Sequence, residues 1–551
     1  MASGKAWNRR LALAGGTAVA AGAAAWAFYK SQPSRHEVAG PGVFRRGNVA
    51  EPRTIDPLLS DGVQEFEIIG DLMVGLMAHD PDGQPIPGMA THWESSTDGL
   101  TWIFHLREAQ WSDGQPVTAD DFVFAWRRIL DPEVASSYSY FLYLVKNAEA
   151  VNSRKLPPTT LGVRAVDPRT FEIHLVHPAP YLLEMLTHTA TMALPRHVVE
   201  AKGRDWARPE NFVGNGPFVL KEWIPNEYVL VEKNPRFYDA ANVALQQVYF
   251  YPTADYGVAL QRFRAGELDF QDRFPEQQIS WIRKNLPRTI DPVPQLITEI
   301  IAFNLKRKPF EDIRVREAIN LAINREAVTG RILRAGHVPA YALIPPGTAN
   351  YPRGPALRFQ TMPYPQRLER ARSLMQAAGF GPDRRLETSY MIRATVPGLY
   401  RSIAAAVQQM LAQIHVDIAI LPNDMQVFYP AIQAHDFDIA ESGWQADFND
   451  ASTFLDLYRT GSGNNWGEYS NSAFDAMMDA AQADLNLESR GKKLAAAESI
   501  MLGDFAAAPL FYWVNLNLTW PYVRGFKANP MDYHRSRWIT IDQSARQKQF
   551  T

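Results

Sequence analysis

The chain has 551 residues, of which 46% are hydrophobic and 21% charged, and its formal net charge is −3. These values are typical of a folded protein with enough apolar side chains for a sizeable core, and the length predicts roughly three or four domains. A net charge so near zero gives no electrostatic basis for binding nucleic acid or anionic lipid. Cysteine is absent, which excludes disulfides, thiolate metal sites, a cysteine nucleophile and a lipid-modified N-terminal cysteine.

The first 42 residues predict an export signal or membrane tether followed by a linker. Lys5 and Arg9-Arg10 form a short positive start, and residues 11–28 carry no charge. Ala25-Trp26-Ala27 offers a cleavage site, and the paired arginines resemble a twin-arginine signal. An uncleaved anchor is the alternative, since about 20 apolar residues span a bilayer, but the glycine and alanine content makes this a poor anchor. We therefore expect the mature protein in the periplasm, either cleaved or tethered.

The first half of the mature chain predicts strands, turns and short helices. Apolar residues at helical spacing predict a helix over 64–76, and Asp80-Pro81-Asp82-Gly83 predicts a hairpin turn. Thr118 is the expected N-cap of the helix that follows it. Alternating apolar residues predict strands over 100–106, 163–166, 170–175, 218–223 and 228–233, and a helix is expected over 258–265.

The second half predicts alternating strands and helices. A strand is expected over 297–304, helices over 368–379 and 400–414, and a further strand over 416–421. The next strand is expected to end near Ala440 and to break at Ser442-Gly443. This alternation of strand and helix is typical of an α/β fold with a parallel or mixed sheet.

The stretch from 436 to 475 has the composition of a binding site. Trp444 follows the expected strand, Asp447 and Asp450 come close behind it, and a Gly/Asn-rich segment leads to Trp466. An indole offers apolar contact and one N–H donor, and a carboxylate kept from bulk water pairs well with an ammonium group. The alternative is a capped helix start before Thr453, and this reading suits Asp450 better than Asp447.

Motifs that would indicate an enzyme are missing. The sequence contains no nucleophile elbow, no phosphate-binding Walker loop and no dinucleotide fingerprint. The twelve histidines do not have metal-ligand spacing. Asp447 and Asp450 could imitate the carboxylate pair of a hydrolase, but nothing else around them points to hydrolysis. We expect no catalytic residue, no metal and no cofactor.

A series of short segments follows a characteristic order along the chain. They are Glu51-Pro52, Asp56-Pro57, Pro87-Gly88-Met89-Ala90, Trp111-Ser112-Asp113-Gly114, Thr118-Ala119-Asp120-Asp121-Phe122, Gly214-Asn215-Gly216-Pro217-Phe218, Phe263-Arg264-Ala265-Gly266-Glu267-Leu268-Asp269, Arg314-Val315-Arg316-Glu317-Ala318, Leu343-Ile344-Pro345-Pro346-Gly347 and Gly443-Trp444 with Ala446-Asp447. In this order the chain resembles the extracytoplasmic solute-binding proteins of peptide ABC transporters, family 5, in its oligopeptide-binding branch. The resemblance covers about Val49 to the end.

The resemblance implies an α/β, two-lobed periplasmic binding protein fold of type II, with mixed sheets and an extra inserted subdomain. The implied lobe I consists of 43–77, 202–300 and 517–551, the inserted subdomain of 78–201, and lobe II of 301–516. Such a protein traps a peptide between its lobes by hinge closure. The implied partners are a peptide ligand and the ABC permease and ATPase subunits of a transporter. We expect a monomer that binds no nucleic acid.

The same resemblance assigns expected roles to six residues. Asp447 stands where the family places the carboxylate that pairs with the α-ammonium of the ligand, and Trp444 matches the neighbouring cleft aromatic. Tyr140 resembles a tyrosine that reaches in from the inserted subdomain, and Val63 lies in the loop whose backbone runs beside the peptide. Asn464 and Asn465 also fit the oligopeptide-binding pattern.

Four positions depart from that pattern. Glu441 and Ile432 stand where the oligopeptide branch has arginines, Met425 stands at an aromatic position, and Ala302 replaces an acid. Those arginines would neutralise the carboxylate of short peptides, so we expect a ligand without a nearby C-terminal carboxylate, such as a longer or modified peptide.

Three alternatives remain at this point. The same fold could bind a nickel chelate, haem, an opine or a sugar, the protein could be an exported peptidase, or the binding fold could serve a chaperone-like or sensory role.

Overall fold

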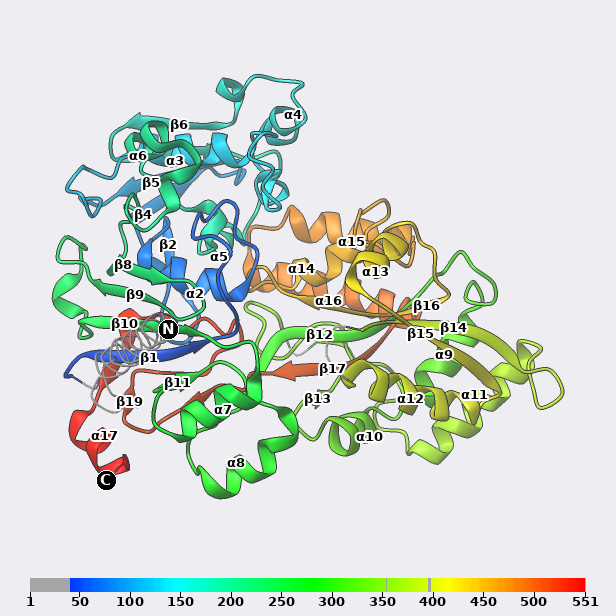
Figure 1. The fold of residues 1–551 in the computed structure, drawn as a ribbon. Coiled ribbons are helices and arrows are strands. Elements are labelled where there is room, and N and C mark those ends of the chain that lie inside the picture. Colours follow the sequence, from blue (N-terminus) through cyan, green and yellow to red (C-terminus); the bar gives the residue numbers. More distant parts are fainter. Residues whose placement is uncertain (1–39, 353, 395–397, 551) are drawn as a thin grey trace, which may run out of the picture.

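The computed structural model describes residues 40–352, 354–394 and 398–550. Two six-stranded sheets form the centres of two lobes, and a four-stranded sheet belongs to a smaller subdomain above the first lobe (Figure 1). The expected export signal lies almost wholly in residues 1–39, outside the described residues. Within the described residues, none of the helices has the length and apolar character needed to span a bilayer.

The first six-stranded sheet gathers segments from distant parts of the sequence. Its strand order is β18-β11-β1-β10-β9-β8. These strands are β1 (Val43–Asn48), β8 (Phe218–Ile224), β9 (Tyr228–Lys233), β10 (Gln247–Pro252), β11 (Phe270–Gln271) and β18 (Leu518–Thr519). Buried charges join both ends of the chain here, because Arg45 in β1 and Arg546 in the C-terminal helix α17 (Gln543–Phe550) both pair with Asp269, at 3.1 and 3.0 Å.

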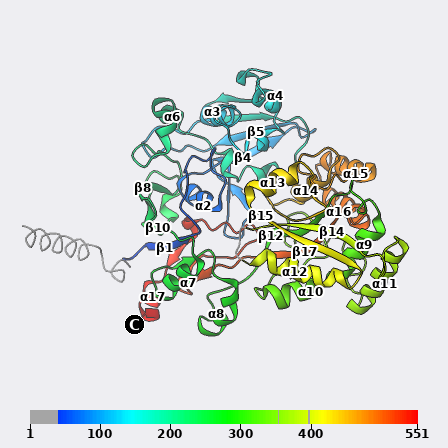
Figure 2. The same ribbon diagram turned by 45° about the vertical axis from the view of Figure 1, so that its right-hand side comes forward.

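The four-stranded sheet has the order β4-β5-β7-β6 and is covered by helix α3. Its elements are β4 (Ala90–Ser95), β5 (Thr101–Leu106), α3 (Ala119–Ile129), β6 (Val163–Asp167) and β7 (Thr170–His174). The expected N-cap of α3 is present, and the backbone N–H of Thr118 donates to the Asp121 carboxylate at 2.8 Å. Side chains of this sheet and of the first six-stranded sheet share one apolar core, so the subdomain is packed onto the first lobe (Figure 2).

The second six-stranded sheet has the order β13-β17-β12-β16-β14-β15. Its strands are β12 (Pro294–Phe303), β13 (Val338–Pro339), β14 (Leu386–Arg393), β15 (Val416–Asn423), β16 (Ile439–Gln445) and β17 (Ala507–Val514). The helices packed in this lobe include α9 (Ile313–Ala322), α11 (Tyr364–Ala377), α12 (Leu399–Ala412), α13 (Met425–Gln433), α15 (Ser472–Gln482) and α16 (Leu487–Gly503). This lobe has its own apolar core, separate from that of the first lobe.

The carboxyl ends of three strands of this sheet meet at one edge. Strands β14, β15 and β16 run parallel, and β12 runs antiparallel to β16. The edge therefore combines the ends of β14 and β16 with the start of β12. In α/β sheets, ligands bind at this kind of edge.

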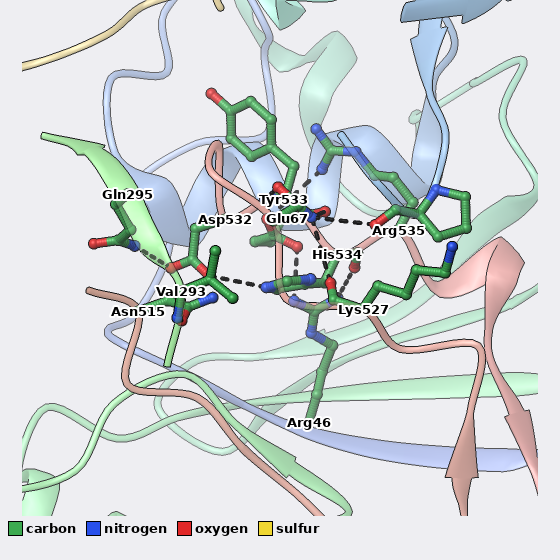
Figure 3. Close-up of polar contacts among 12 residues, drawn as sticks. Arg46, Glu67, Val293, Gln295, Asn515, Lys527, Asp532, Tyr533, His534 and Arg535 are labelled. Atoms are coloured by element: carbon green, nitrogen blue, oxygen red, sulfur yellow. Dashed lines mark hydrogen bonds and ion pairs between the residues drawn. The ribbon is translucent and has the colours of Figure 1, made fainter. Parts of the chain in front are cut away.

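Polar contacts hold the segments that cross between the lobes (Figure 3). Val293 and Asn515 exchange two hydrogen bonds, with Asn515 Oδ1 accepting from the Val293 N–H at 2.8 Å and the Asn515 N–H donating to the Val293 carbonyl at 3.0 Å. Gln295 Nε2 donates to Asp532 at 2.6 Å, and His534 contacts the same carboxylate at 2.9 Å. The boundary expected between lobe I and lobe II, at residue 300, lies inside strand β12. The predicted domain boundaries stay a prediction.

Two of the differences between predicted and observed element ends have a clear physical cause. Helix α2 (Val63–Leu72) ends four residues before the expected Leu76, because the side chain of Asn215 hydrogen-bonds the N–H and the carbonyl of Val74 at 2.9 and 3.0 Å. Strand β16 does not break at Ser442-Gly443. It continues to Gln445 because β12 pairs with it through Thr298↔Trp444.

Candidate ligand-binding site

Asp447 lies two residues beyond the end of β16 and is half-buried. Tyr140 Oη donates to its carboxylate at 3.4 Å. Within the described residues, Asp447 has no lysine, arginine or histidine at ion-pair distance. Burial raises the pKa of Asp447 to about 6, against the opposing effect of the Tyr140 hydrogen bond. The carboxylate is thus partly desolvated and lacks a cation.

Tyr140 brings the inserted subdomain to this carboxylate. It lies in the short 3₁₀ helix η1 (Ser139–Leu142), and 46% of its surface is exposed. Its ring stacks on Tyr138, with centroids 5.9 Å apart, and Tyr138 in turn packs on the buried His188 at 4.7 Å. Burial, aided by the charge of Arg535, lowers the pKa of His188 to about 3, so this imidazole is neutral and supplies no charge to Asp447. Tyr140 lies beside Asp447, and its role in ligand binding stays a prediction.

Trp444 is half-buried in β16 and packs against the core of the second lobe. Its indole Nε1 donates to Thr453 Oγ1 at 3.0 Å, so the N–H is already used within the protein. The indole lines a depression of about 410 Å³, part of it open to solvent. The other lining residues include Ile300, Ala302, Asn464, Asn465, Leu457 and Trp466. Trp444 therefore offers a ligand its apolar surface.

Asn464 and Asn465 line the same depression but differ in their bonding. Asn465 is buried, and its Nδ2 donates to the carbonyls of Arg459 and Tyr469 at 3.0 and 2.7 Å, while its Oδ1 accepts from the Tyr469 N–H at 2.9 Å. This amide fixes the loop and has no hydrogen left for a ligand. Asn464 is exposed at the rim, which leaves it the better candidate for ligand contact.

Val63 was expected in a loop, but it is the first residue of helix α2, and the loop ends at Gly62. The difference follows from the bonding of the first turn, in which the Gly62 carbonyl accepts from the N–H groups of Glu65 and Phe66 at 3.1 Å. The position of Val63 beside a ligand stays a prediction.

Asp450 is a structural residue, but it is not the N-cap of the short helix α14 (Ser452–Leu455), because that position is occupied by Ala451. The Oδ1 of Asp450 accepts from the Ser452 N–H at 2.9 Å in the turn that leads into this helix. Both of its oxygens also bind the buried Arg490, at 2.6 and 2.8 Å. Arg490 lies over the ring of Tyr181, which stacks on Phe448 with centroids 5.1 Å apart. These contacts attach the loop after β16 to the inserted subdomain and so hold Asp447 beside Tyr140.

Comparison with known proteins then decides the family. Residues 84–466 match the family described as bacterial extracellular solute-binding proteins, family 5. The chain belongs to this family. The periplasmic oligopeptide-binding protein OppA of Salmonella typhimurium is 33% identical over 534 residues, which are 95% of this chain and 97% of that protein. The family is one of solute-binding proteins.

Two further family members bear on the ligand. The probable deoxycholate-binding periplasmic protein YgiS of Escherichia coli K12 is 34% identical over 516 residues, covering 92% of this chain and 95% of that protein. The structure of the periplasmic murein tripeptide-binding protein MppA in its unliganded open form has a TM-score of 0.81 and 32% identity, over 91% of this chain and 98% of that one. The predicted family and the two-lobed α/β fold are confirmed.

The four departures from the family pattern lie in three different settings. Ala302 and Ile432 are buried in one small apolar cluster, together with Met391, Phe428, Phe437 and Ala440. Glu441 is buried and forms an ion pair with Arg393 at the end of β14. Met425 starts helix α13 and is 37% exposed, so it offers an apolar contact near the sheet edge. The sequence analysis missed Arg393, because only the pairing of β14 with β16 brings it to Glu441.

Proposed function

We propose that the protein is the substrate-binding component of an ABC importer and captures peptides between its two lobes. The proposal depends above all on Asp447, a partly desolvated carboxylate that has no cation within the described residues and lies between the lobes beside Tyr140. A carboxylate in such a place costs free energy until a cation joins it. The α-ammonium of a peptide is a compact cation that can also donate hydrogen bonds.

The surroundings of Asp447 suit an extended peptide. The depression beside Trp444 presents a mostly apolar lining to a ligand, and Asn464 lies at its rim. Tyr140 comes from the inserted subdomain, so a ligand bound to Asp447 contacts both bodies. Closure of the lobes over the ligand then removes water from the ion pair and strengthens it.

A calorimetric experiment tests the role of Asp447. The ligands are pairs of peptides that differ only in a free or acetylated N-terminus, in lengths of three to six residues. The free amine should bind at least about 100-fold more tightly to the wild type, which corresponds to about 3 kcal/mol for a charge-assisted hydrogen bond. Asp447→Asn should remove that difference. Asp479→Asn, a change at an exposed carboxylate of the same lobe, is the matched control. Equal binding of both forms to the wild type would contradict the proposal.

The remaining assignments extend this proposal. The protein delivers its ligand to a permease with ATPase subunits, acts as a monomer, and reaches the periplasm through its N-terminal segment by the twin-arginine route. OppA and MppA are named as periplasmic proteins, which supports this location. Intact mass spectrometry of protein from the periplasmic fraction tests cleavage, and replacement of Arg9 and Arg10 by lysine tests the export route.

A non-peptide ligand is the second candidate. The apolar cluster of Ala302 and Ile432, and the relative named as a probable deoxycholate-binding protein, both favour an apolar ligand with few charges. A thermal-shift screen separates the two candidates, because a bound ligand raises stability by mass action. Stabilisation by deoxycholate at micromolar concentration, without stabilisation by any peptide, would favour this second candidate.

A further inference from the structure

Three charged side chains form a compact cluster at the ligand-facing edge of the second lobe. Glu441 in β16 receives hydrogen bonds from Arg393 at the end of β14, including Nε to Oε2 at 2.8 Å. Arg393 Nη2 is also 3.8 Å from Oε1 of Glu299 in β12. Because β14 and β16 end at this edge and β12 begins there, the cluster lies at the same end of these strands as Asp447.

The cluster contains one carboxyl group more than its single arginine can neutralise. Glu299 and Glu441 are 2% and 1% exposed. Glu299 Oε2 accepts from Trp513 Nε1 at 3.1 Å, but its Oε1 has no hydrogen-bond partner within the described residues. Burial, together with the negative charge of Glu441, raises the pKa of Glu299 well above its ordinary value. The net charge is −1 when both acids are ionised and zero when Glu299 holds a proton.

Arg393 is the most exposed member of the cluster. Its side chain is 19% exposed, and its Nη2 also donates to the hydroxyl of Tyr400 at 3.2 Å. The two acids hold the guanidinium in place and offset its charge. A ligand group beside Arg393 therefore meets hydrogen-bond donors that belong to a cluster without net positive charge.

The backbone at Gly443 makes this arrangement possible. A Cβ atom at Gly443 would lie 3.1 Å from Glu299 Oε2, which is tighter than ordinary van der Waals contact. Gly443 also lines the depression beside Trp444. The carboxyl group of Glu299 is thus packed directly beneath a wall of the proposed binding site.

We propose that Glu299, Glu441 and Arg393 form a specificity element that accepts an uncharged hydrogen-bond acceptor of the ligand and rejects a carboxylate. This inference depends on the proposed function, which places the amino end of the peptide at Asp447. Glu441 precedes Asp447 by six residues, so their Cα atoms are at most about 20 Å apart along an extended chain. A peptide of about three to six residues spans that distance. The free carboxylate of such a peptide is excluded, whereas the backbone carbonyl of a longer peptide or an amidated end is accepted.

Peptides of three to six residues, each with a C-terminal acid or a C-terminal amide, test the inference by calorimetry. For the length whose end reaches Arg393, the wild type should bind the amide at least tenfold more tightly than the acid. Glu441→Gln should narrow this preference, and the double variant Glu299→Gln/Glu441→Gln should reverse it, because Arg393 then keeps a net positive charge. Glu326→Gln, which removes an acid from a different arginine pair in the same lobe, should leave the preference unchanged.

The outcomes separate this inference from the proposed function. If acid and amide forms bind the wild type equally at every length, the inference is wrong and the proposed function stands. If no peptide of either form binds, both are wrong. The wild-type comparison needs no variant, so it decides the question even if the double variant does not fold.

Discussion

The pH dependence of peptide affinity follows directly from the environment of Asp447. Burial raises the pKa of Asp447 to about 6 in the free protein. An α-ammonium group pairs with the ionised form, so binding lowers this pKa well below 6. Affinity should therefore be highest near pH 7 and should fall as the pH decreases through 6, with a proton released on binding in the lower range. Above about pH 8 the affinity should fall again, because the α-amine of the peptide then loses its own proton.

The size of the effect can be calculated from the same pKa. At pH 5, one unit below it, about one tenth of the free protein carries an ionised Asp447, so the dissociation constant should be about tenfold higher than at pH 7.5. Calorimetry in two buffers with different ionisation enthalpies measures both the affinity and the number of protons released. Asp447→Asn should bind weakly and show no such dependence between pH 5 and 7.5. The reasoning would be refuted if the dissociation constant of the wild type did not change with pH, or if its pH dependence persisted in Asp447→Asn.

Three further predictions concern other parts of the protein. Trp444→Phe should keep most of the peptide affinity, because the indole N–H is used by Thr453. Trp444→Ala should weaken peptide binding about tenfold in calorimetry. An equal loss of affinity in both variants would show that the N–H contacts the ligand. Arg490→Ala leaves Asp450 buried without a cation and should lower the free energy of unfolding by about 3–5 kcal/mol in urea denaturation, while a loss below about 1 kcal/mol would show that the pair is dispensable. Burial raises the pKa of Asp272 to about 7, above its unfolded value near 3.8, so the wild type should lose stability as the pH rises from about 4 to 7 and level off above that. Asp272→Asn should therefore add about 4 kcal/mol to the free energy of unfolding at pH 8 and less than about 1 kcal/mol at pH 4, and a gain that is the same at both pH values would contradict the assignment.

Patterns that act over a few residues predicted much of the fold. The alternation of strand and helix after residue 297 predicted the mixed sheet of the second lobe, and Thr118 was identified correctly as an N-cap from its own neighbourhood. The errors lie where a distant residue decides the local structure. Asn215 ends helix α2 early, and pairing with β12 carries β16 through Gly443, where turn chemistry had predicted a break.

The residues of the candidate site also fall into two kinds, those that local patterns identify and those whose role depends on distant partners. Asp447 and Trp444 could be selected because an acid and an indole follow one strand closely. Asp450 could not be assigned fully, since its partner Arg490 is 40 residues away and only the folded chain joins them. Arg393 carried no sequence signal at all, because its importance comes from the buried acids of two other strands. Charge balance among distant residues is a property of the packed sheet and cannot be obtained from spacing along the chain.

A crystal structure of the protein with a bound peptide tests the central claim most directly, through the distance between the amino nitrogen of the peptide and the carboxylate of Asp447. The account predicts a charge-assisted hydrogen bond of about 2.7–2.9 Å, with Tyr140 beside it. An amino end placed elsewhere in the cleft, with the Asp447 carboxylate left in contact with water alone, would contradict it.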